Sequence, residues 1–414
     1  MISVFTPHYN QTNPYLSECY ESLRRQTVTD WEWVIVVNNG GTVPAAIRTD
    51  SRVRCVTCES DLIGALKRAG CEDASGEILV ELDADDILMP ECLAELAAVF
   101  EDKGVSFAHS NSAQFTDGTW SPHKYSEYWG WTSRPFVYEG HDLWEMVSFD
   151  ASPHSMRAIY WCPNHVRAWR ASDYREIGGH NPKLAVIDDY DLLCRTYLHG
   201  KRMARIDKCL YLYREYSGQA TKERNPAIQA ANWDMYERYI IPMAQKWAQM
   251  QGLPMIDLGG AISKPESYIS LDLHDADIVC DLRKGIPYPD SSVGVVRAYD
   301  ALEHLPDSVF TMNEIWRVLV PGGWLLASIP STDGRGAFQD PTHVSFWNEN
   351  SIGYYTDPQF QRYVPSITAR FQVSRVLTWF PSEWHKSRKI NYVDAQLIAV
   401  KDGLRAPGEC LWPQ

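Results

Sequence analysis

The sequence lacks the features that would mark an exported or membrane-embedded protein. No run approaches the roughly 20 apolar residues that a transmembrane helix needs. The start, "MISVFTPHYN", has no basic region followed by a long apolar segment, as a secretory signal peptide has. The ten cysteines follow no framework of regular spacings, which is typical of reduced thiols. We therefore expect a cytoplasmic protein.

Positive charge is also scarce. The formal net charge of −14 argues against a general nucleic-acid or anionic-membrane surface, although a local basic groove is compatible with it. The shortage is greatest between residues 71 and 102, which contain eleven acidic side chains and no Lys or Arg. Because crowded carboxylates repel one another and raise each other's pKa, this segment is either a solvated face or receives positive charge from elsewhere.

The length and the hydrophobic pattern predict two α/β domains. A chain of 414 residues, 45% hydrophobic and 22% charged, can form two cores of ordinary size. In the first half, the strand candidates "ISVFTP", "WEWVIVVNNG", "RVRCVTCES" and "EILVELDADD" alternate with helical segments. Such alternation predicts a doubly wound sheet that binds ligands outside the carboxyl ends of its strands. The aromatic stretch "YSEYWGWTSRPFVY" is expected to be a loop over the sheet edge.

A second alternation begins near residue 254. The strand candidates there are "MIDL", "YISLDL", "DIVCDL", "VGVVRAYD" and "WLLASIP", with the clearest helix in "DSVFTMNEIWRVL". A helical stretch over 226–252 separates the two alternating regions. We therefore expect a first domain over 1–225, a helical linker over 226–252 and a second domain over 253–414.

Three aspartates follow the fourth strand candidate in "ELDADD". Side chains two apart in an extended segment point the same way, so Asp83 and Asp85 can face one site while Asp86 faces elsewhere. Hard oxygen ligands of this kind suit Mg²⁺ or Mn²⁺, with phosphate oxygens completing the shell. The alternative is a turn or helix cap, because the segment leads into a helical pattern. The residues alone leave both interpretations open.

Several segments in a fixed order extend this interpretation. "ISVFTPHYN", "WEWVIVVNNG", "GALKRAG", "ASGEILVELDADDILMP" and "YREIGGHNPKLAVIDDYDLLCR" together resemble the family 2 glycosyltransferases over residues 1–221. The resemblance implies a GT-A nucleotide-sugar-binding domain. It also implies inverting transfer of a sugar from a nucleotide-diphosphate sugar, with a UDP-sugar favoured, to an acceptor hydroxyl. A glycan, a lipid-linked, a protein or a modified-nucleobase acceptor all stay open.

The resemblance assigns the donor site residue by residue. The base pocket would be lined by Thr6, Pro7, Tyr9 and Asn10, and by Asn38, which stands where the family usually has an aspartate. Lys67 would lie near the nucleotide, and Arg214 would contact the diphosphate. Asp83 would contact the ribose or the diphosphate, and Asp83 and Asp85 together would bind the metal. For Lys67 the alternative is a solvated helix charge. Where many members have a histidine, this chain has Tyr216, so the third ligand of the implied Mn²⁺ or Mg²⁺ is open.

The catalytic base is expected in "IDDYDLLCR". Acids are common at helix starts for structural reasons, because they cap the helix and complement its dipole. In the resembling family the motif is Glu-Asp and its second acid deprotonates the acceptor, a position that Asp189 takes here while Asp188 replaces the Glu. Acceptor contacts are implied for Trp161, His165 and Trp169, for each of which core packing is an equal alternative.

Residues 254–330 resemble class I S-adenosylmethionine-dependent methyltransferases, which implies a Rossmann-like domain. The matching stretches are "DIVCDLRKGIPYPDSSVGVVRAYDALEHLPD" and "MNEIWRVLVPGGWLLASIP". The cofactor residues implied are Gly259 and Gly260 in the loop, Asp272 on the ribose, and Asp281 and Leu282 beside the adenine. After Gly260 the loop lacks the family's further glycines. Such a domain would methylate the glycosylated product; the alternatives are a degenerate module for acceptor binding or assembly, and a protein that only binds.

Overall fold

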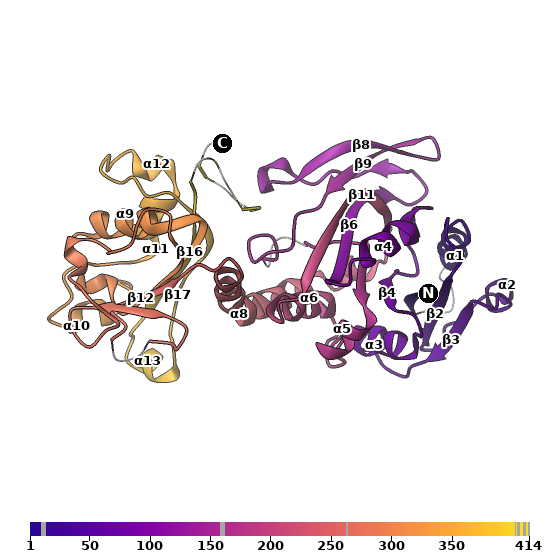
Figure 1. Cartoon of the computed structure of the whole chain (residues 1–414), viewed down its shortest axis with the longest axis horizontal. Coiled ribbons are helices and arrows are strands. Elements are labelled where there is room, and N and C mark those ends of the chain that lie inside the picture. The colour runs from indigo at the N-terminus through magenta and orange to yellow at the C-terminus, as the bar shows by residue number, and fades with distance from the viewer. Residues whose placement is uncertain are drawn as a thin grey trace. The chain divides into compact units, whose positions relative to one another are not determined.

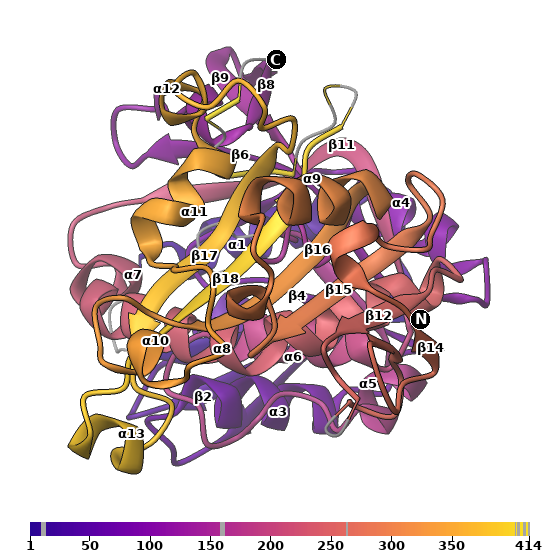
Figure 2. The ribbon, with the colours of Figure 1, turned by 90° about the vertical axis from the view of Figure 1, so that its left-hand side faces the viewer.

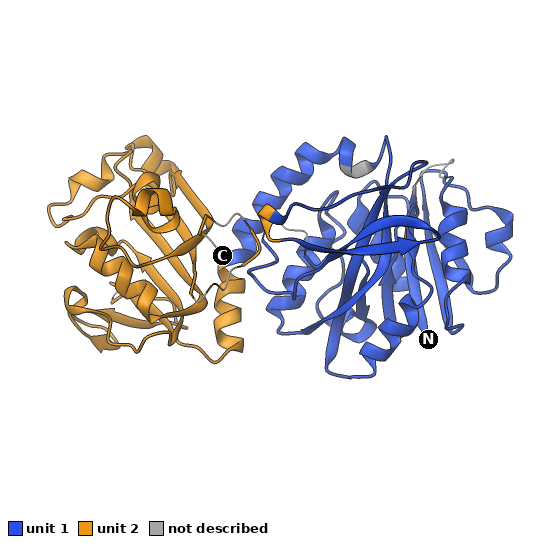
Figure 3. Ribbon diagram, turned by 90° about the horizontal axis from the view of Figure 1, so that it is seen from above, with its two compact units in different colours: residues 1–127, 131–240 blue, residues 128–130, 241–414 orange. Residues whose placement is uncertain are grey.

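The structure, a computed structural model, describes residues 1–9, 14–157, 162–261, 264–401, 403, 406–408 and 411–412. It divides into two compact units, formed by residues 1–127 with 131–240 and by residues 128–130 with 241–414 (Figure 3). Helix α8 (Asn225–Met250) contributes to both units (Figure 1). The separate linker between two domains stays a prediction, since each unit includes part of this helix.

A mixed sheet forms the centre of the first unit. Its strands in the described residues are β1 (Ile2–Tyr9), β2 (Trp31–Asn38), β3 (Val53–Thr57), β4 (Ile78–Glu81), β5 (Ile87–Leu88), β6 (Val105–Thr116), β7 (Ser121–Pro122), β8 (Thr132–Tyr138), β9 (His141–Val147), β10 (Arg167–Arg170) and β11 (Arg202–Glu215). The helices are α1 (Leu16–Arg24), α2 (Ala45–Arg48), α3 (Ile63–Asp73), α4 (Cys92–Phe100), α5 (Ala171–Glu176), α6 (Asp188–Leu198) and α7 (Ala220–Glu223), and the 3-10 turn η1 covers Glu127–Trp129.

The strand order is β3-β2-β1-β4-β10-β6-β11-β5. The first four strands are parallel, whereas β10 runs antiparallel to both β4 and β6. Between β1 and β4, the spatial order of the strands no longer follows their order in the sequence. Because β1, β2 and β4 are parallel, their carboxyl ends lie together at one edge of the sheet near this point. That edge is the usual ligand site of a doubly wound sheet.

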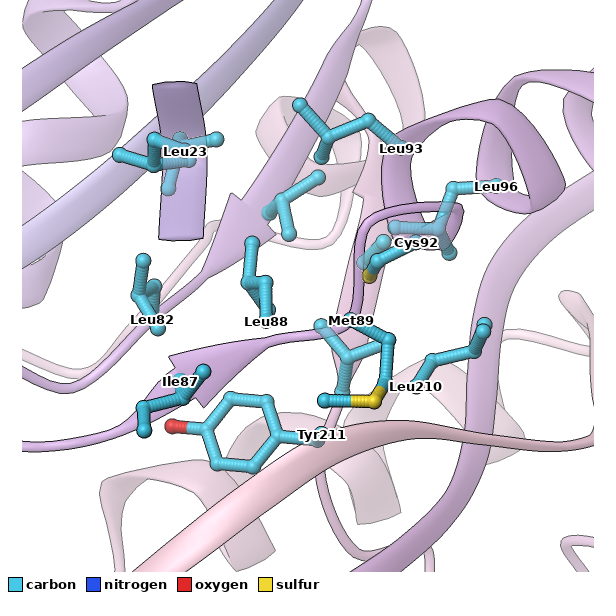
Figure 4. Packing of buried hydrophobic residues seen from close by; sticks show 14 of the residues in the cluster. Leu23, Leu82, Ile87, Leu88, Met89, Cys92, Leu93, Leu96, Leu210 and Tyr211 are labelled. Atoms are coloured by element: carbon cyan, nitrogen blue, oxygen red, sulfur yellow. The ribbon is translucent and has the colours of Figure 1, made fainter. Parts of the chain in front are cut away.

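The core of the first unit explains why its helices form where they do. Apolar residues on one face of α1 and α4 pack against β5 and β11 (Figure 4). Leu23 of α1 and Leu93 of α4 are completely buried, and so is Leu210 of β11. Burying a side chain of this size contributes about 1.5–3 kcal/mol, so the amphipathic pattern is sufficient to hold these elements to the sheet.

One local prediction is wrong. Within the expected loop over residues 125–138, Thr132–Tyr138 is strand β8, which pairs with β9 in an antiparallel hairpin next to β6. Its side chains alternate between exposed and half-buried positions, so only one face contacts the protein. Phe136 and Tyr138 lie on the half-buried face, but the alternation is interrupted at Arg134 and Pro135, which are both exposed, so the strand pattern is weak in the sequence.

The second unit is a seven-stranded sheet in the described residues, with the order β14-β13-β12-β15-β16-β18-β17 (Figure 2). Only β18 runs antiparallel, between β16 and β17. The strands are β12 (Met255–Leu258), β13 (Ile269–Asp272), β14 (Ile278–Val279), β15 (Val293–Tyr299), β16 (Leu319–Pro330), β17 (Phe371–Trp379) and β18 (Tyr392–Ala399). The helical elements are η2 (Leu282–Lys284), η3 (Leu302–His304), α9 (Ser308–Val318), α10 (Gly336–Gln339), α11 (Glu349–Thr356), α12 (Pro358–Gln361) and α13 (Glu383–Ser387).

This order is that of a doubly wound Rossmann-like sheet with one antiparallel strand inserted near the edge. The fold of both units is therefore α/β, as the sequence predicts. None of the helices in the described part of the chain combines the length and the apolar character of a membrane span.

Candidate active site

The acidic segment after β4 sorts its three aspartates into two environments. Asp86 is buried, and its carboxylate accepts hydrogen bonds from the Tyr211 hydroxyl at 2.7 Å and the Arg214 backbone N–H at 2.8 Å. Asp83 and Asp85 are partly exposed, with 34% of the Asp83 side chain accessible. Asp86 therefore fixes the turn, and the two residues that the sequence predicts on one face are left available for a ligand.

A buried ion-pair network lies beside this segment and is centred on Glu81. Lys67 of α3 donates to Glu81 at 2.6 Å, and Arg167 of β10 donates to the same carboxylate at 3.0 Å. Burial by itself would raise the pKa of Glu81, but the two cations outweigh it and hold the pKa well below its usual value. The alternative of a solvated charge at Lys67 is wrong, since only 5% of this residue is exposed.

The same network reaches the start of α6. Arg167 donates through Nη1 to Asp189 Oδ2 at 2.6 Å, and the Tyr190 backbone N–H donates to Asp189 Oδ1 at 2.8 Å. Although Asp189 is largely buried, the charges of Arg167 and Lys67 overcome the effect of burial and lower its pKa. Asp189 is therefore ionised at neutral pH, and its two oxygens keep free lone pairs for a further donor.

Asp188 has a different environment. Its side chain is 3% exposed, against 12% for Asp189, and its Oδ2 lies 3.5 Å from both Lys67 Nζ and His180 Nε2. Burial raises the pKa of Asp188 to about 6. Ile187, just before it, has a φ of 52°, a left-handed conformation that is strained for a β-branched residue. This turn directs Asp188 inward and leaves Asp189 nearer the surface.

His165 connects the base candidate with the acidic segment. Its ring stacks on Tyr211 with the centroids 4.5 Å apart. Its Nε2 lies 3.3 Å from Arg167 Nη2 and 3.8 Å from Asp83 Oδ2. Burial, followed by the charge of Arg167, lowers the pKa of His165 to about 3, so the imidazole is neutral. The contacts Asp83–His165–Arg167–Asp189 therefore bring four side chains from three separate segments to one site.

Of the other two acceptor candidates, only Trp169 is among the described residues, and it does not reach this site. Trp169 is completely buried and packs against Phe107 with ring centroids 4.9 Å apart, as its packing alternative predicts. Trp161 lies outside the described residues, so its assignment stays a prediction.

Arg214 lies beside the acidic segment but is held by carboxylates. It donates at 2.7 Å to Asp117 and at 2.7 Å to Glu18, and at 2.8 Å to the backbone carbonyl of Asp85. Its contact with a diphosphate stays a prediction. Tyr216 forms a hydrogen bond with the Asp85 carboxylate, which, together with burial, raises the Tyr216 pKa.

The base pocket is described only in part. Thr6 is completely buried and accepts a hydrogen bond from the Trp33 indole at 2.8 Å, so its side chain faces the core. Pro7 is half-buried, whereas Asn10 and the side chain of Tyr9 lie outside the described residues. Asn38 is buried; its amide donates to the Ser60 carbonyl, while its Oδ1 has no hydrogen-bond partner in the described part of the chain. That oxygen fits a ligand N–H.

The residues at the strand ends fit a divalent cation. Within the described ranges, no Lys or Arg nitrogen forms an ion pair with the carboxylate of Asp83 or Asp85, although Glu81 and Asp189 nearby are both paired. Burial, with the neighbouring carboxylates, raises the pKa of Asp83 to about 7. Two close carboxylates without a basic partner are a suitable oxygen donor set for Mg²⁺ or Mn²⁺.

In the second unit, the two predicted loop glycines are required by packing. Gly259 has a φ of 74°, and a Cβ there would lie 2.9 Å from the Ala301 Cβ. A Cβ at Gly260 would lie 2.2 Å from Asp257 Oδ2. Asp257 is buried and accepts from Arg297 at 2.7 Å. The loop after β12 therefore passes closely over a buried acid, which only glycine permits.

The remaining cofactor candidates differ in their availability. Asp272 ends β13, and its side chain accepts a hydrogen bond from the Leu273 backbone N–H. Its remaining lone pairs can accept ribose hydroxyls. Asp281 is already engaged, because it caps η2 and accepts from Arg283 at 2.8 and 3.0 Å. Leu282 is partly buried against the core. Asp272 thus fits S-adenosylmethionine better than Asp281 does.

The comparisons with known proteins agree with both folds. Residues 3–158 match the model of glycosyl transferase family 2, and residues 260–327 match a methyltransferase domain model. The N-terminal part of the chain is therefore similar to family 2 glycosyltransferases, and the C-terminal part contains a region similar to methyltransferase domains.

Individual relatives match each part. Glycosyltransferase GlyG of Streptococcus pneumoniae is 26% identical over 53% of this chain and 72% of its own length. A protein of Mycolicibacterium smegmatis named "Probable S-adenosylmethionine-dependent methyltransferase" is 39% identical over 16% of this chain and 28% of its own length. The solved structure of S. aureus TarS 1–349 has a TM-score of 0.42 at 15% identity, covering 60% of this chain and 70% of that one. The chain spans only 11–35% of the length of four other curated relatives.

Sequence reasoning missed several residues that hold the candidate site of the first unit together. Glu81, Arg167 and His180 are buried and charged or polar, and the sequence analysis assigns a site role to none of them, although Glu81 opens "ELDADD". Arg167 lies 86 residues from Glu81, so no local spacing could pair them. The available signal was indirect: the surplus of acids over 71–102 required a basic partner from elsewhere in the chain.

Proposed function

We propose that the first unit is an inverting glycosyltransferase that uses Asp189 as its general base. The observation that supports this most directly is the line of contacts from Asp189 through Arg167 and His165 to Asp83. It connects an ionised carboxylate, which can act as the base, with the acids at the strand ends, which can bind the donor. A single displacement needs both functions in one site.

In the proposed reaction, Asp189 takes the proton of the acceptor hydroxyl. The acceptor oxygen attacks the anomeric carbon of the donor sugar as the bond from that carbon to the diphosphate oxygen breaks. One displacement inverts the configuration and needs no enzyme nucleophile. Arg167 keeps Asp189 ionised and oriented, because it donates to one carboxylate oxygen at 2.6 Å.

The donor is a nucleotide-diphosphate sugar, with a UDP-sugar favoured. Asn38 Oδ1, buried and without a partner in the described residues, accepts an N–H of the base. Asp83 and Asp85 hold Mg²⁺ or Mn²⁺, which supplies charge neutralisation for the leaving diphosphate when it is bound. Tyr216 orients the Asp85 carboxylate through their hydrogen bond.

The first test compares Asp189→Asn with Asp188→Asn. Loss of a general base typically lowers the rate by about 10²–10⁴-fold, so Asp189→Asn should lose turnover while it still binds the donor. Asp188→Asn is the matched control, since it changes the neighbouring acid that faces inward. If Asp188→Asn is inactive and Asp189→Asn retains turnover, the assignment of the base is wrong by one residue.

The second test concerns the donor and its ion. A panel of nucleotide sugars is scored by donor hydrolysis and thermal shift, with and without Mn²⁺. Asp85→Asn should abolish the stimulation by metal while the fold persists. Undiminished transfer in this variant or in EDTA would contradict the proposed ion site.

For the second unit we propose that Asp272 binds the ribose of S-adenosylmethionine. When bound, this cofactor supplies an electrophilic methyl group. We propose that the glycosylated product accepts this methyl group. A carboxylate that accepts two hydroxyls forms charge-assisted hydrogen bonds. Asp272→Ala should therefore weaken the calorimetric binding of S-adenosylmethionine and S-adenosylhomocysteine and leave sugar transfer unchanged. No binding of either by the native chain at millimolar concentration would favour the alternative, a module for acceptor binding or assembly.

A further inference from the structure

Three metal-ligating side chains converge in the second unit, and none of them is among the residues proposed for the cofactor. One ligand atom each of Glu303, His304 and His343 lies within 4.8 Å of the other two. Glu303 and His304 belong to η3, which follows the carboxyl end of β15, and His343 comes from the segment between α10 and α11. This is the edge of a doubly wound sheet at which ligands bind.

Backbone hydrogen bonds fix the two segments against each other without any ion. The backbone N–H groups of Val344 and Ser345 both donate to the Glu303 carbonyl oxygen, at 2.8 and 3.0 Å. The Ser345 hydroxyl donates to the Leu302 carbonyl at 2.8 Å. The side chains of η3 and of His343 are therefore held close by the fold itself, as a preformed site requires.

The hydrogen bonds of both imidazoles leave one nitrogen free to bind a ligand. His343 Nδ1 lies 3.0 Å from the Ala337 carbonyl oxygen, and His304 Nδ1 lies 3.3 Å from the Thr342 carbonyl oxygen. A carbonyl oxygen can only accept a hydrogen bond, so in each neutral ring the proton sits on Nδ1 and Nε2 keeps its lone pair. Metal-binding histidines are typically oriented in this way by a backbone carbonyl.

Glu303 is a buried acid whose carboxylate requires a partner. Only 2% of the residue is exposed, and its Oε2 has no hydrogen-bond partner in the described part of the chain. Its Oε1 lies 4.0 Å from His343 Nε2. A buried carboxylate oxygen without a donor is unfavourable, because it loses its hydrogen bonds to water and gains none in the protein, and a cation beside it removes this penalty.

We propose that Glu303, His304 and His343 bind a divalent transition-metal ion, with Zn²⁺ as the best match. Two imidazoles and one carboxylate form a donor set that suits Zn²⁺ and is poorly suited to Mg²⁺. Bonds of about 2.0–2.1 Å in a tetrahedral shell separate the donor atoms by about 3.4 Å. Glu303 Oε1 and His343 Nε2, which lie 4.0 Å apart without an ion, therefore need to approach each other by only a fraction of an ångström. Three protein ligands leave one position for water or for an acceptor oxygen.

The test uses the full chain carrying Asp85→Asn, so that the proposed ion site of the first unit does not contribute. The chain is stripped of metal with a chelator and titrated with Zn²⁺ against a chromophoric competitor; Co²⁺ is added separately to record its visible spectrum. We expect one Zn²⁺ per chain and the intense visible bands of four-coordinate Co²⁺. His304→Gln and Glu303→Gln should each weaken Zn²⁺ binding at least tenfold.

His274→Gln is the matched control, because it removes an exposed histidine of the same unit outside the cluster. It should bind Zn²⁺ like the parent. Since His304 is exposed, its variant should unfold like the parent when metal-free, which separates lost binding from lost structure. No Zn²⁺ binding by the parent at micromolar concentration, or equal affinities of His304→Gln, Glu303→Gln and His274→Gln, would overturn the proposal.

Discussion

Replacing Glu81 by Gln tests whether the buried network is a single electrostatic unit. Glu81 is completely buried and lies within 3.0 Å of nitrogens from Lys67 and Arg167. Glutamine keeps the size of the side chain but removes the charge, and its amide donors face two cations. The charges of Lys67 and Arg167 are then balanced by Asp188 and Asp189 at the start of α6.

The expected loss of stability follows from the contacts. Breaking a buried ion pair by removing one partner typically lowers the free energy of unfolding by about 3–5 kcal/mol. Asp189 still accepts from Arg167 at 2.6 Å, and Asp188 lies 3.5 Å from Lys67, so the loss should fall at the lower end, about 3 kcal/mol. The free energy is measured by urea denaturation with near-ultraviolet circular dichroism.

Glu139→Gln is the matched control, since it removes an exposed partner of Arg25 whose side chain is half accessible. Exposed ion pairs contribute about 0.2–1 kcal/mol, so the free energy of unfolding of this variant should fall by no more than about 1 kcal/mol. The double change Glu81→Gln with Lys67→Met removes both an anion and a cation and should recover part of the lost stability. A loss below about 1 kcal/mol in Glu81→Gln would refute the reasoning, because it would mean that water or other groups replace the carboxylate freely.

Two further predictions concern the first unit. Burial lowers the pKa of His109 to about 3, below its unfolded value, so its neutral form stabilises the fold fully above about pH 6.5 and this contribution is lost as the pH falls toward 3. His109→Gln should reduce the slope of unfolding free energy against pH by about 1.4 kcal/mol per pH unit in that window, measured by urea denaturation from pH 7 to pH 4; parallel curves would contradict it. Gly64→Ala places a Cβ 2.1 Å from the Asn181 carbonyl oxygen and should destabilise by about 1–3 kcal/mol in thermal unfolding. Gly104→Ala, where the nearest atom belongs to the end of the Asp102 side chain, should stay within about 0.5 kcal/mol; equal effects at the two positions would disprove the clash.

The sequence by itself determined the α/β class and both doubly wound patterns. Strands such as "WEWVIVVNNG" and "MIDL" are mostly apolar and do not alternate regularly with polar residues, because parallel strands are buried on both faces, and this pattern is local. The strand-end position of Asp83 and Asp85 was equally readable, since it needs only the end of β4 and the alternation of side chains. The donor and cofactor assignments came from resemblance and stay predictions.

Only the tertiary structure decided how the charges are paired. Glu81 and Arg167 are 86 residues apart, and the segment from 71 to 102 contains no cation of its own, so the pairing depends on β10 lying antiparallel to β4. The same holds for Glu303 and His343, whose segments are joined by backbone hydrogen bonds. Local sequence patterns report which face of a strand or helix is buried, whereas contacts between distant segments depend on strand order, which the pattern of any one segment does not contain.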